Sequence, residues 1–132
     1  MEAEIKPRMY LAACILGVLA ACGGSSDSYE AAVDAANAKQ AQAVSLASAM
    51  PCSNVSQCNV LRFVPPTGRC SCVSYQAYSL ISSTADLARL AATEQNELAM
   101  TARSIGGLSE VCYCPGPPLM TCSAASECAL AQ

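Results

Sequence analysis

The residues with the clearest capacity for chemistry in this chain are its cysteines. The 132 residues include 10 cysteines, and eight of them follow Pro51 in a symmetric order: Cys-x5-Cys and Cys-x-Cys, then Cys-x-Cys and Cys-x5-Cys. Because their number is even, all eight can pair, and in an oxidising compartment four disulfides are the expected state. The predicted disulfide cysteines are Cys52, Cys58, Cys70, Cys72, Cys112, Cys114, Cys122 and Cys128.

Spacing constrains only part of the pairing. In a strand, the two side chains of Cys-x-Cys point to the same face, and a bond between them would be strained. We therefore expect Cys70 and Cys72 to find partners elsewhere. We predict links to the Cys112 and Cys114 segment that staple both ends of the second helix, with the Cys-x5-Cys pairs closing locally or across the helix ends.

Metal binding and redox catalysis are weaker interpretations of the same cysteines. Cys-x-Cys pairs with neighbouring methionines can bind Cu(I), but of Met50, Met100 and Met120 only Met120 lies near a cysteine motif. Thioredoxin-like catalysts and zinc ribbons use Cys-x-x-Cys, a spacing that the sequence lacks. We therefore predict no metal and no cofactor, and Cu(I) binding stays a less favoured alternative.

The sequence contains no histidine. This excludes Ser-His-Asp and Cys-His nucleophile systems as well as histidine-ligated zinc. A Ser-Lys dyad would depend on Lys39, whose Ala-rich surroundings predict a surface position, and Glu94 and Glu97 have the spacing of a solvated helix face. We predict that the protein is not an enzyme. Its net charge of -3, without a basic cluster, also argues against nucleic acid as a partner.

The N-terminus indicates export. A basic lead precedes an apolar run of about 13 residues, which is too short to cross a bilayer as a helix. The run ends in Leu19-Ala20-Ala21-Cys22-Gly23, which resembles the lipobox of bacterial lipoprotein precursors. The resemblance implies that residues 1–21 are a removed signal peptide with Cys14 in its interior. It also implies that Cys22 carries a diacylglycerol thioether and an N-acyl chain such as palmitate.

The same resemblance implies a location. Several acyl chains anchor a protein stably without a membrane span, so the lipid bilayer is a predicted partner through Cys22. Gly23, in place of the Asp that retains many lipoproteins at the inner membrane, implies the outer membrane, with the domain in the periplasm or at the cell surface. We expect residues 22–27 to form a flexible tether and residues 28–132 a single cysteine-rich domain.

Two long helices are predicted, at about 28–50 and 84–105. Asp27 and Glu30 have the spacing of a capping box, Pro51 ends the first helix, and Gly106-Gly107 follows the second. Their similar lengths favour an antiparallel pair. The apolar face of the first helix is predicted to consist of Tyr29, Val33, Ala36, Ala43, Ala47 and Met50. The apolar face of the second helix is predicted to consist of Leu87, Leu90, Ala91, Leu98, Ala102 and Ile105. A solvated face of the second helix carries Arg89, Glu94, Glu97 and Arg103.

Short strands are predicted between and after the helices. Residues 60–64 and 69–75 have strand-forming composition, and Pro65-Pro-Thr-Gly68 supplies a turn between them. Residues 111–114 could add a third strand. The expected fold is a small disulfide-stapled α+β domain with an antiparallel hairpin or three-stranded sheet, and the alternative is a mainly α helical hairpin with Cys-rich loops.

The functional expectation is a noncatalytic, membrane-anchored envelope lipoprotein with a structural or partner-binding role, and the partner is an unidentified envelope protein. The segments Cys58-Asn-Val-Leu61, Cys72 and Tyr75-Gln-Ala-Tyr78-Ser79 are weakly similar to small exported Cys-rich bacterial proteins, which implies export and bridges but no activity. The alternative is an inhibitor of an exported hydrolase that uses a bridge-braced loop. The candidate binding-loop residues are Arg69, Pro115, Gly116 and Pro117.

Overall fold

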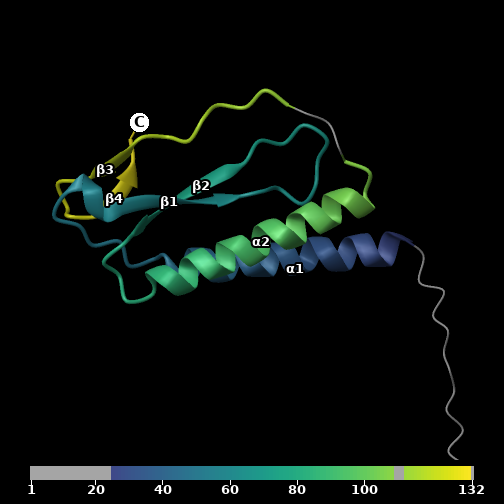
Figure 1. Cartoon of the computed structure of the whole chain (residues 1–132), viewed down its shortest axis with the longest axis horizontal. Coiled ribbons are helices and arrows are strands. Elements are labelled where there is room, and N and C mark those ends of the chain that lie inside the picture. The colour runs from purple at the N-terminus through teal and green to yellow at the C-terminus, as the bar shows by residue number, and fades with distance from the viewer. Residues whose placement is uncertain (1–24, 109–111, 132) are drawn as a thin grey trace, which may run out of the picture.

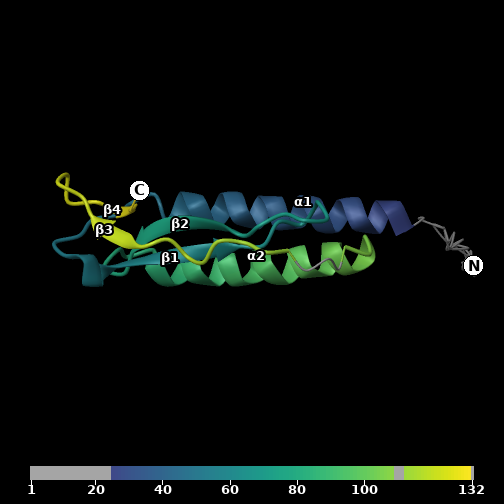
Figure 2. The ribbon, with the colours of Figure 1, turned by 90° about the horizontal axis from the view of Figure 1, so that it is seen from above.

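The computed structural model describes residues 25–108 and 112–131, so the predicted signal peptide and Cys22 lie outside the described residues. The fold is a small α+β domain with two separate two-stranded antiparallel sheets. Two helices pack side by side on one face of the first sheet, and the C-terminal chain crosses its other face (Figures 1 and 2). The elements are α1 (Ser25–Leu46), the short helix η1 (Val55–Gln57), β1 (Cys58–Phe63), β2 (Ser74–Ser79), α2 (Ala85–Ile105), β3 (Met120–Cys122) and β4 (Cys128–Leu130).

Helix α1 buries the alanines expected of it but has different ends. Ala36, Ala43 and Ala47 are buried, as predicted. The helix begins at Ser25, so residues 25–27 are helical rather than part of a tether and Asp27 lies in the first turn rather than at a cap. The predicted end at Met50 is also wrong. The position before a proline disfavours helical geometry, and the Met50 carbonyl instead accepts a hydrogen bond from the Cys128 amide at 2.8 Å.

Helix α2 has the predicted ends, but its predicted apolar face is confirmed only in part: Ala91 and Ala102 are buried and Leu98 is half-buried. Its buried side consists mostly of alanines, whereas Leu87, Leu90 and Ile105 of the predicted apolar side are exposed. Small side chains on that side let the backbone approach α1 and the sheet closely, which leaves the bulkier leucines at the solvent edge. The buried residues of α2 are Ala85, Ala88, Ala91, Ala92, Gln95, Ala99 and Ala102.

Contacts at both ends confirm that the helices are antiparallel. A Cβ on Gly106, just after α2, would lie 2.8 Å from Cε2 of Tyr29 near the start of α1, so the two helix ends are in close contact there. At the other end, the Thr84 hydroxyl donates a hydrogen bond to the Leu46 carbonyl at 2.6 Å. Helix α2 closes with Gly107 at a φ of 65°, the left-handed conformation that glycine adopts without steric cost.

The first hairpin is confirmed, with a longer connection than predicted. Strand β1 pairs with β2 from Cys58↔Ser79 to Phe63↔Ser74, so residues 64–73 form the loop, and the predicted strand 69–75 is wrong over most of its length. One face of the hairpin packs Leu61, Phe63 and Tyr78 on the alanines of both helices. The opposite face carries Cys58 and Ala77 into a second cluster, which contains the remaining buried cysteines, Cys52 and Cys128.

A second hairpin, β3–β4, was not expected from the sequence. Its strands are only three residues long, too short for an alternating pattern to be recognised. Its turn depends on Ser126 at a φ of 59°, with the Ser126 amide bonded to the Ser123 carbonyl at 2.9 Å. The predicted third strand is wrong over its described residues 112–114, which form no ladder and lead into the Pro115–Pro118 segment.

Candidate functional site

All eight predicted disulfide cysteines are paired, in two parallel sets. Cys52 bonds to Cys122 and Cys58 to Cys128, each across 70 residues. Cys70 bonds to Cys112 and Cys72 to Cys114, each across 42 residues, which confirms the predicted link between these two segments. The expectation that the Cys-x5-Cys motifs close locally is wrong, because each cysteine pairs with its counterpart in the other motif.

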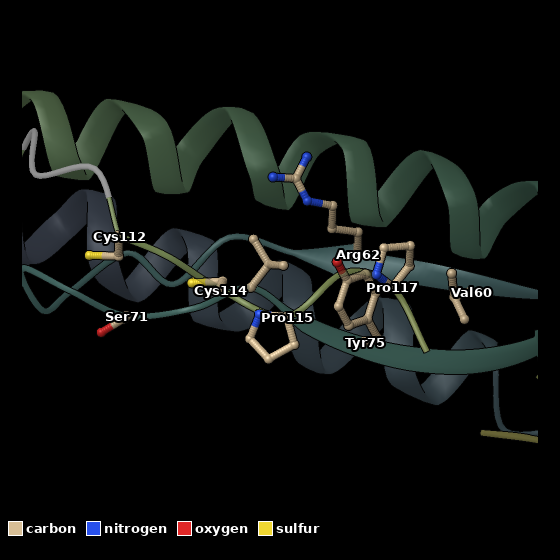
Figure 3. A pocket seen from close by; sticks show the side chains of 9 residues that line it. Val60, Arg62, Ser71, Tyr75, Cys112, Cys114, Pro115 and Pro117 are labelled. Atoms are coloured by element: carbon tan, nitrogen blue, oxygen red, sulfur yellow. The ribbon is translucent and has the colours of Figure 1, made fainter. Parts of the chain in front are cut away.

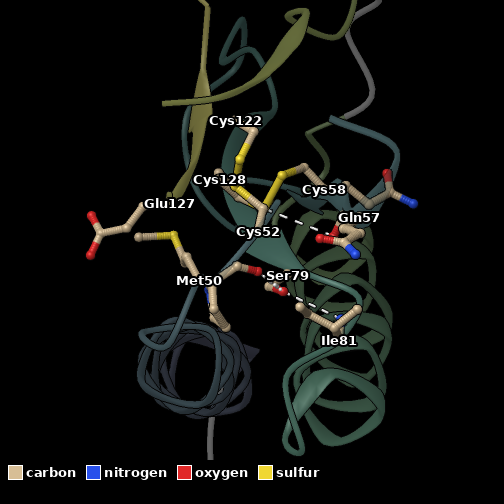
Figure 4. The surroundings of a disulfide bond; sticks show 12 residues. Met50, Cys52, Gln57, Cys58, Ser79, Ile81, Cys122, Glu127 and Cys128 are labelled. Carbon is tan, nitrogen blue, oxygen red and sulfur yellow. Dashed lines mark hydrogen bonds between the residues drawn. A yellow bond between two sulfur atoms is a disulfide. The ribbon is translucent and has the colours of Figure 1, made fainter. Parts of the chain in front are cut away.

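The Cys52–Cys122 and Cys58–Cys128 bridges lie together in the second cluster (Figure 4). The sulfur atoms of Cys52, Cys58 and Cys128 are all within 4.8 Å of one another, and Met50 packs against them. The Ser79 hydroxyl donates to the Pro51 carbonyl beside this cluster. These sulfurs are in disulfides, whereas a soft metal binds thiolate, so the oxidised cluster acts as a packed core that holds β3–β4 on the first hairpin.

The other two bridges lie beside the C-terminal end of α2, not at its two ends as predicted. They join the loop 64–73 to the extended chain after residue 111. Arg103 in the last turn of α2 holds this loop: its guanidinium donates to the Gly68 carbonyl at 2.9 Å and to the Pro65 carbonyl at 3.2 Å, with longer contacts to two further loop carbonyls. The prediction of a solvated Arg103 is therefore wrong.

Two amides of α2 fix the start of the same loop. The Val64 amide donates to Oδ1 of Asn96 at 2.8 Å, and the Val64 carbonyl accepts from Nε2 of Gln95 at 2.7 Å. Nδ2 of Asn96 also donates to the Arg62 carbonyl at 3.0 Å. These side chains replace the ladder partners that the chain loses where β1 ends. Sequence reasoning missed them, although a glutamine within an Ala-rich helix face was a usable signal.

A groove of about 600 Å³ lies between the β1–β2 hairpin, its connecting loop and the 112–117 segment (Figure 3). Val60, Arg62 and Tyr75 come from the two strands and form its floor, and Pro115 and Pro117 form a wall above them. The remaining lining residues are Ser71, Val73, Cys112 and Cys114.

The groove has the chemistry of a binding site. Most of its lining is apolar, and its polar side chains are one guanidinium, one phenol and one hydroxyl, with both cysteines in disulfides. The lining contains no carboxylate and no amine that could act as a general base. Among the described residues, no acidic group forms an ion pair with Arg62, which is exposed, so its charge is available to a ligand in the groove.

The structure separates the predicted binding-loop residues. Pro115 and Pro117 line the groove, and Gly116 lies exposed between them. Arg69 lies in a turn outside the groove, and its carbonyl accepts from Arg103 at 3.4 Å. The first candidate inhibitor loop is therefore a turn at Arg69, whereas the second, around Gly116, is exposed and without regular secondary structure. Sequence reasoning missed Tyr113, which is fully exposed between two bridged cysteines.

Three other charged residues of α2, Asp86, Arg89 and Glu94, form surface pairs. Lys39 of α1 forms an ion pair with Glu94, and Arg89 pairs with Asp86 at 2.8 Å. Such exposed pairs contribute little to stability. Burial raises the pKa of the Tyr78 phenol above its ordinary value of 10.0. The charge of Arg89 lowers this pKa and the charge of Asp86 raises it, both by less than burial does. Tyr78 faces the helix layer rather than the groove, so this shift concerns stability.

Comparison with known proteins gives no match: no family model, no curated protein sequence and no solved structure is similar to this chain. Among the described helices, none combines the length and the hydropathy needed to cross a membrane.

Proposed function

We propose that this protein is a noncatalytic, lipid-anchored envelope module that binds a protein partner in the groove between the β1–β2 hairpin and the 112–117 segment. The groove carries the proposal, because its lining is mostly apolar and includes Arg62, with which no acidic group among the described residues forms an ion pair. The motif Leu19-Ala20-Ala21-Cys22 supports the anchor, and Gly23 after it favours the outer membrane.

The bracing of the groove supports a binding role. Its proline wall follows directly from two bridged cysteines, and Arg103 and Asn96 hold the loop opposite. A site that is rigid before binding loses little conformational entropy when a partner arrives. The chemistry fits an extended peptide segment that places an apolar side chain against Tyr75 and an acidic group near Arg62.

The anchor is tested by expressing Cys22→Ser in a bacterium with an outer membrane. We expect the wild type to sediment with membranes and the Cys22→Ser variant to lose this association. Cys14→Ser is the matched control, because Cys14 is expected to be removed with the signal peptide. Intact mass before and after reduction reports cleavage, acylation and the four bridges together. A Cys22→Ser protein that still sediments with membranes would contradict the anchor.

The groove is tested by placing a photo-crosslinking amino acid at Tyr75 in cells. We expect one adduct from this position that disappears when Val60→Arg fills the groove. The matched control carries the same amino acid at Asn37, which is exposed on α1 away from the groove, and should not form that adduct. An adduct of equal yield from position 37, or one that Val60→Arg leaves unchanged, would show that the partner does not bind in the groove.

A further inference from the structure

We propose that the end of the molecule formed by the start of α1 and the end of α2 rests on the bilayer surface, so that the helices stand away from the membrane. The proposal rests on the lipid anchor of the proposed function. It adds which surface of the domain contacts lipid and which end is presented to the envelope.

The first observation is the position at which α1 begins. The helix starts at Ser25, and only Gly23 and Gly24 separate this residue from Cys22 in the sequence. Three residue steps span at most roughly 10 Å, even when fully extended. The headgroup layer of a bilayer is about 5 to 8 Å thick on each side. An acylated Cys22 therefore holds the first turn of α1 at or just above the headgroups.

The second observation is what the fold places beside that turn. Because the helices are antiparallel, Gly106 contacts Tyr29, and the C-terminal end of α2 lies at the same end of the molecule. Ile105 is 41% exposed there, and Leu108 is half-buried beside it. Leu108 also helps to line a hollow of about 430 Å³ with Met100, whose side chain is exposed. Exposed apolar groups of this kind partition into the membrane interface.

The charges at this end are of both signs, because Arg103 of α2 lines the same hollow as Met100 and Leu108, and a zwitterionic lipid can pair with both signs. Asp27 and Glu30, in the first turns of α1, are exposed and would be repelled by strongly anionic headgroups. The partner is therefore a bilayer surface whose headgroups contain an ammonium group, such as phosphatidylethanolamine.

The opposite end of the molecule lies far from this surface. The 22 residues of α1 extend about 33 Å, and the segment that carries Ile81 lies beyond its C-terminal end. Figures 1 and 2 show β3 and β4 at that distal end, away from the start of α1. Ile81 is 55% exposed and provides a matched apolar position at the end that should not contact lipid.

Tryptophan fluorescence can test this orientation, because the sequence contains no tryptophan and an introduced indole gives the whole signal. Ile105→Trp and Ile81→Trp, each made in the full acylated protein, place a single indole at one end or the other. Both are reconstituted into phosphatidylethanolamine and phosphatidylcholine vesicles with brominated acyl chains. We expect these lipids to quench Ile105→Trp roughly twofold, with a blue shift, and to leave Ile81→Trp unquenched. Met100→Trp provides a second probe at the membrane end.

Sedimentation of the same vesicles separates the two proposals. If the protein does not sediment with the vesicles, the anchor fails, and the membrane-facing end fails with it. If the protein sediments but bromine quenches neither Ile105→Trp nor Met100→Trp, or quenches Ile81→Trp equally, the anchor stands and the proposed orientation is wrong.

Discussion

Removing one bridge of the Cys70–Cys112 and Cys72–Cys114 set should cost much less than its sequence separation implies. An isolated bridge across 42 residues stabilises by about 4 kcal/mol through restriction of the unfolded chain. The bridges are parallel, however, and each cysteine lies two positions from the next. With Cys72–Cys114 intact, the bridge Cys70–Cys112 closes a ring of only about six residues, 70–72 and 112–114, which corresponds to about 2 kcal/mol.

The assay is urea unfolding followed by far-UV circular dichroism, with both cysteines of a bridge changed to serine so that no free thiol remains. We expect Cys70→Ser/Cys112→Ser to lower the free energy of unfolding by about 2 kcal/mol, and Cys72→Ser/Cys114→Ser by a similar amount. Removal of both bridges should cost about 6 kcal/mol, more than the sum of the two single losses. If removal of one bridge lowers the free energy of unfolding by about 4 kcal/mol, each bridge closes its long loop independently and the prediction is wrong.

The Cys-x5-Cys set provides an internal comparison. Its two bridges are also parallel, but their cysteines are six positions apart, so the second bridge closes a ring of about fourteen residues, 52–58 and 122–128, and contributes about 3 kcal/mol. Cys58 and Cys128 are also buried, and their loss removes packing in the second cluster. Removal of Cys58–Cys128 should therefore cost more than removal of Cys70–Cys112.

Three further predictions concern the bracing of α2. Arg103→Met should lower the free energy of unfolding by about 2 kcal/mol, because the loop carbonyls lose a charged donor. Arg89→Met, which removes only an exposed ion pair, should lower it by less than about 0.5 kcal/mol in the same urea titration. Gly107→Ala should cost about 1 kcal/mol through its positive φ, while Gly116→Ala, with equally open space, should cost nothing measurable by thermal unfolding. Because burial raises the pKa of Tyr78, the unfolded chain loses that proton first, and stability should fall as pH rises above about 10; Tyr78→Phe should reduce this fall.

Local patterns in the sequence predicted the helices well. The Gly106-Gly107 pair ended α2 where expected, because the backbone conformation that closes a helix is a local property. Local geometry also indicated that Cys70 and Cys72 bond outside their own motif, since neighbouring Cys-x-Cys residues cannot bond to each other without strain; it did not identify the partners, which the structure shows to be Cys112 and Cys114. The class of fold, a small α+β domain with bridges, was therefore within reach of the sequence.

Tertiary contacts determined the conformation of the loop beside the groove and the face that α2 buries. Residues 69–73 have the composition of a strand, but the two bridges and the bonds from Arg103 to the carbonyls of residues 65–69 hold them in a loop, and no local pattern in the sequence indicates these distant contacts. Helix α2 turns its alanines inward because close approach of α1 and the hairpin outweighs the burial of its leucines.

Sequence alone therefore located the two helices and the end of α2, indicated that the Cys-x-Cys cysteines bond outside their own motif, and excluded histidine chemistry. The tertiary structure determined the parallel order of the bridges, the face that each helix buries and the position of the groove. The physical reason is the distance along the chain over which each interaction acts. Helix ends and Cys-x-Cys strain depend on neighbours within a few residues. Packing and pairing depend instead on groups 42 or 70 residues apart, which only the folded chain brings together.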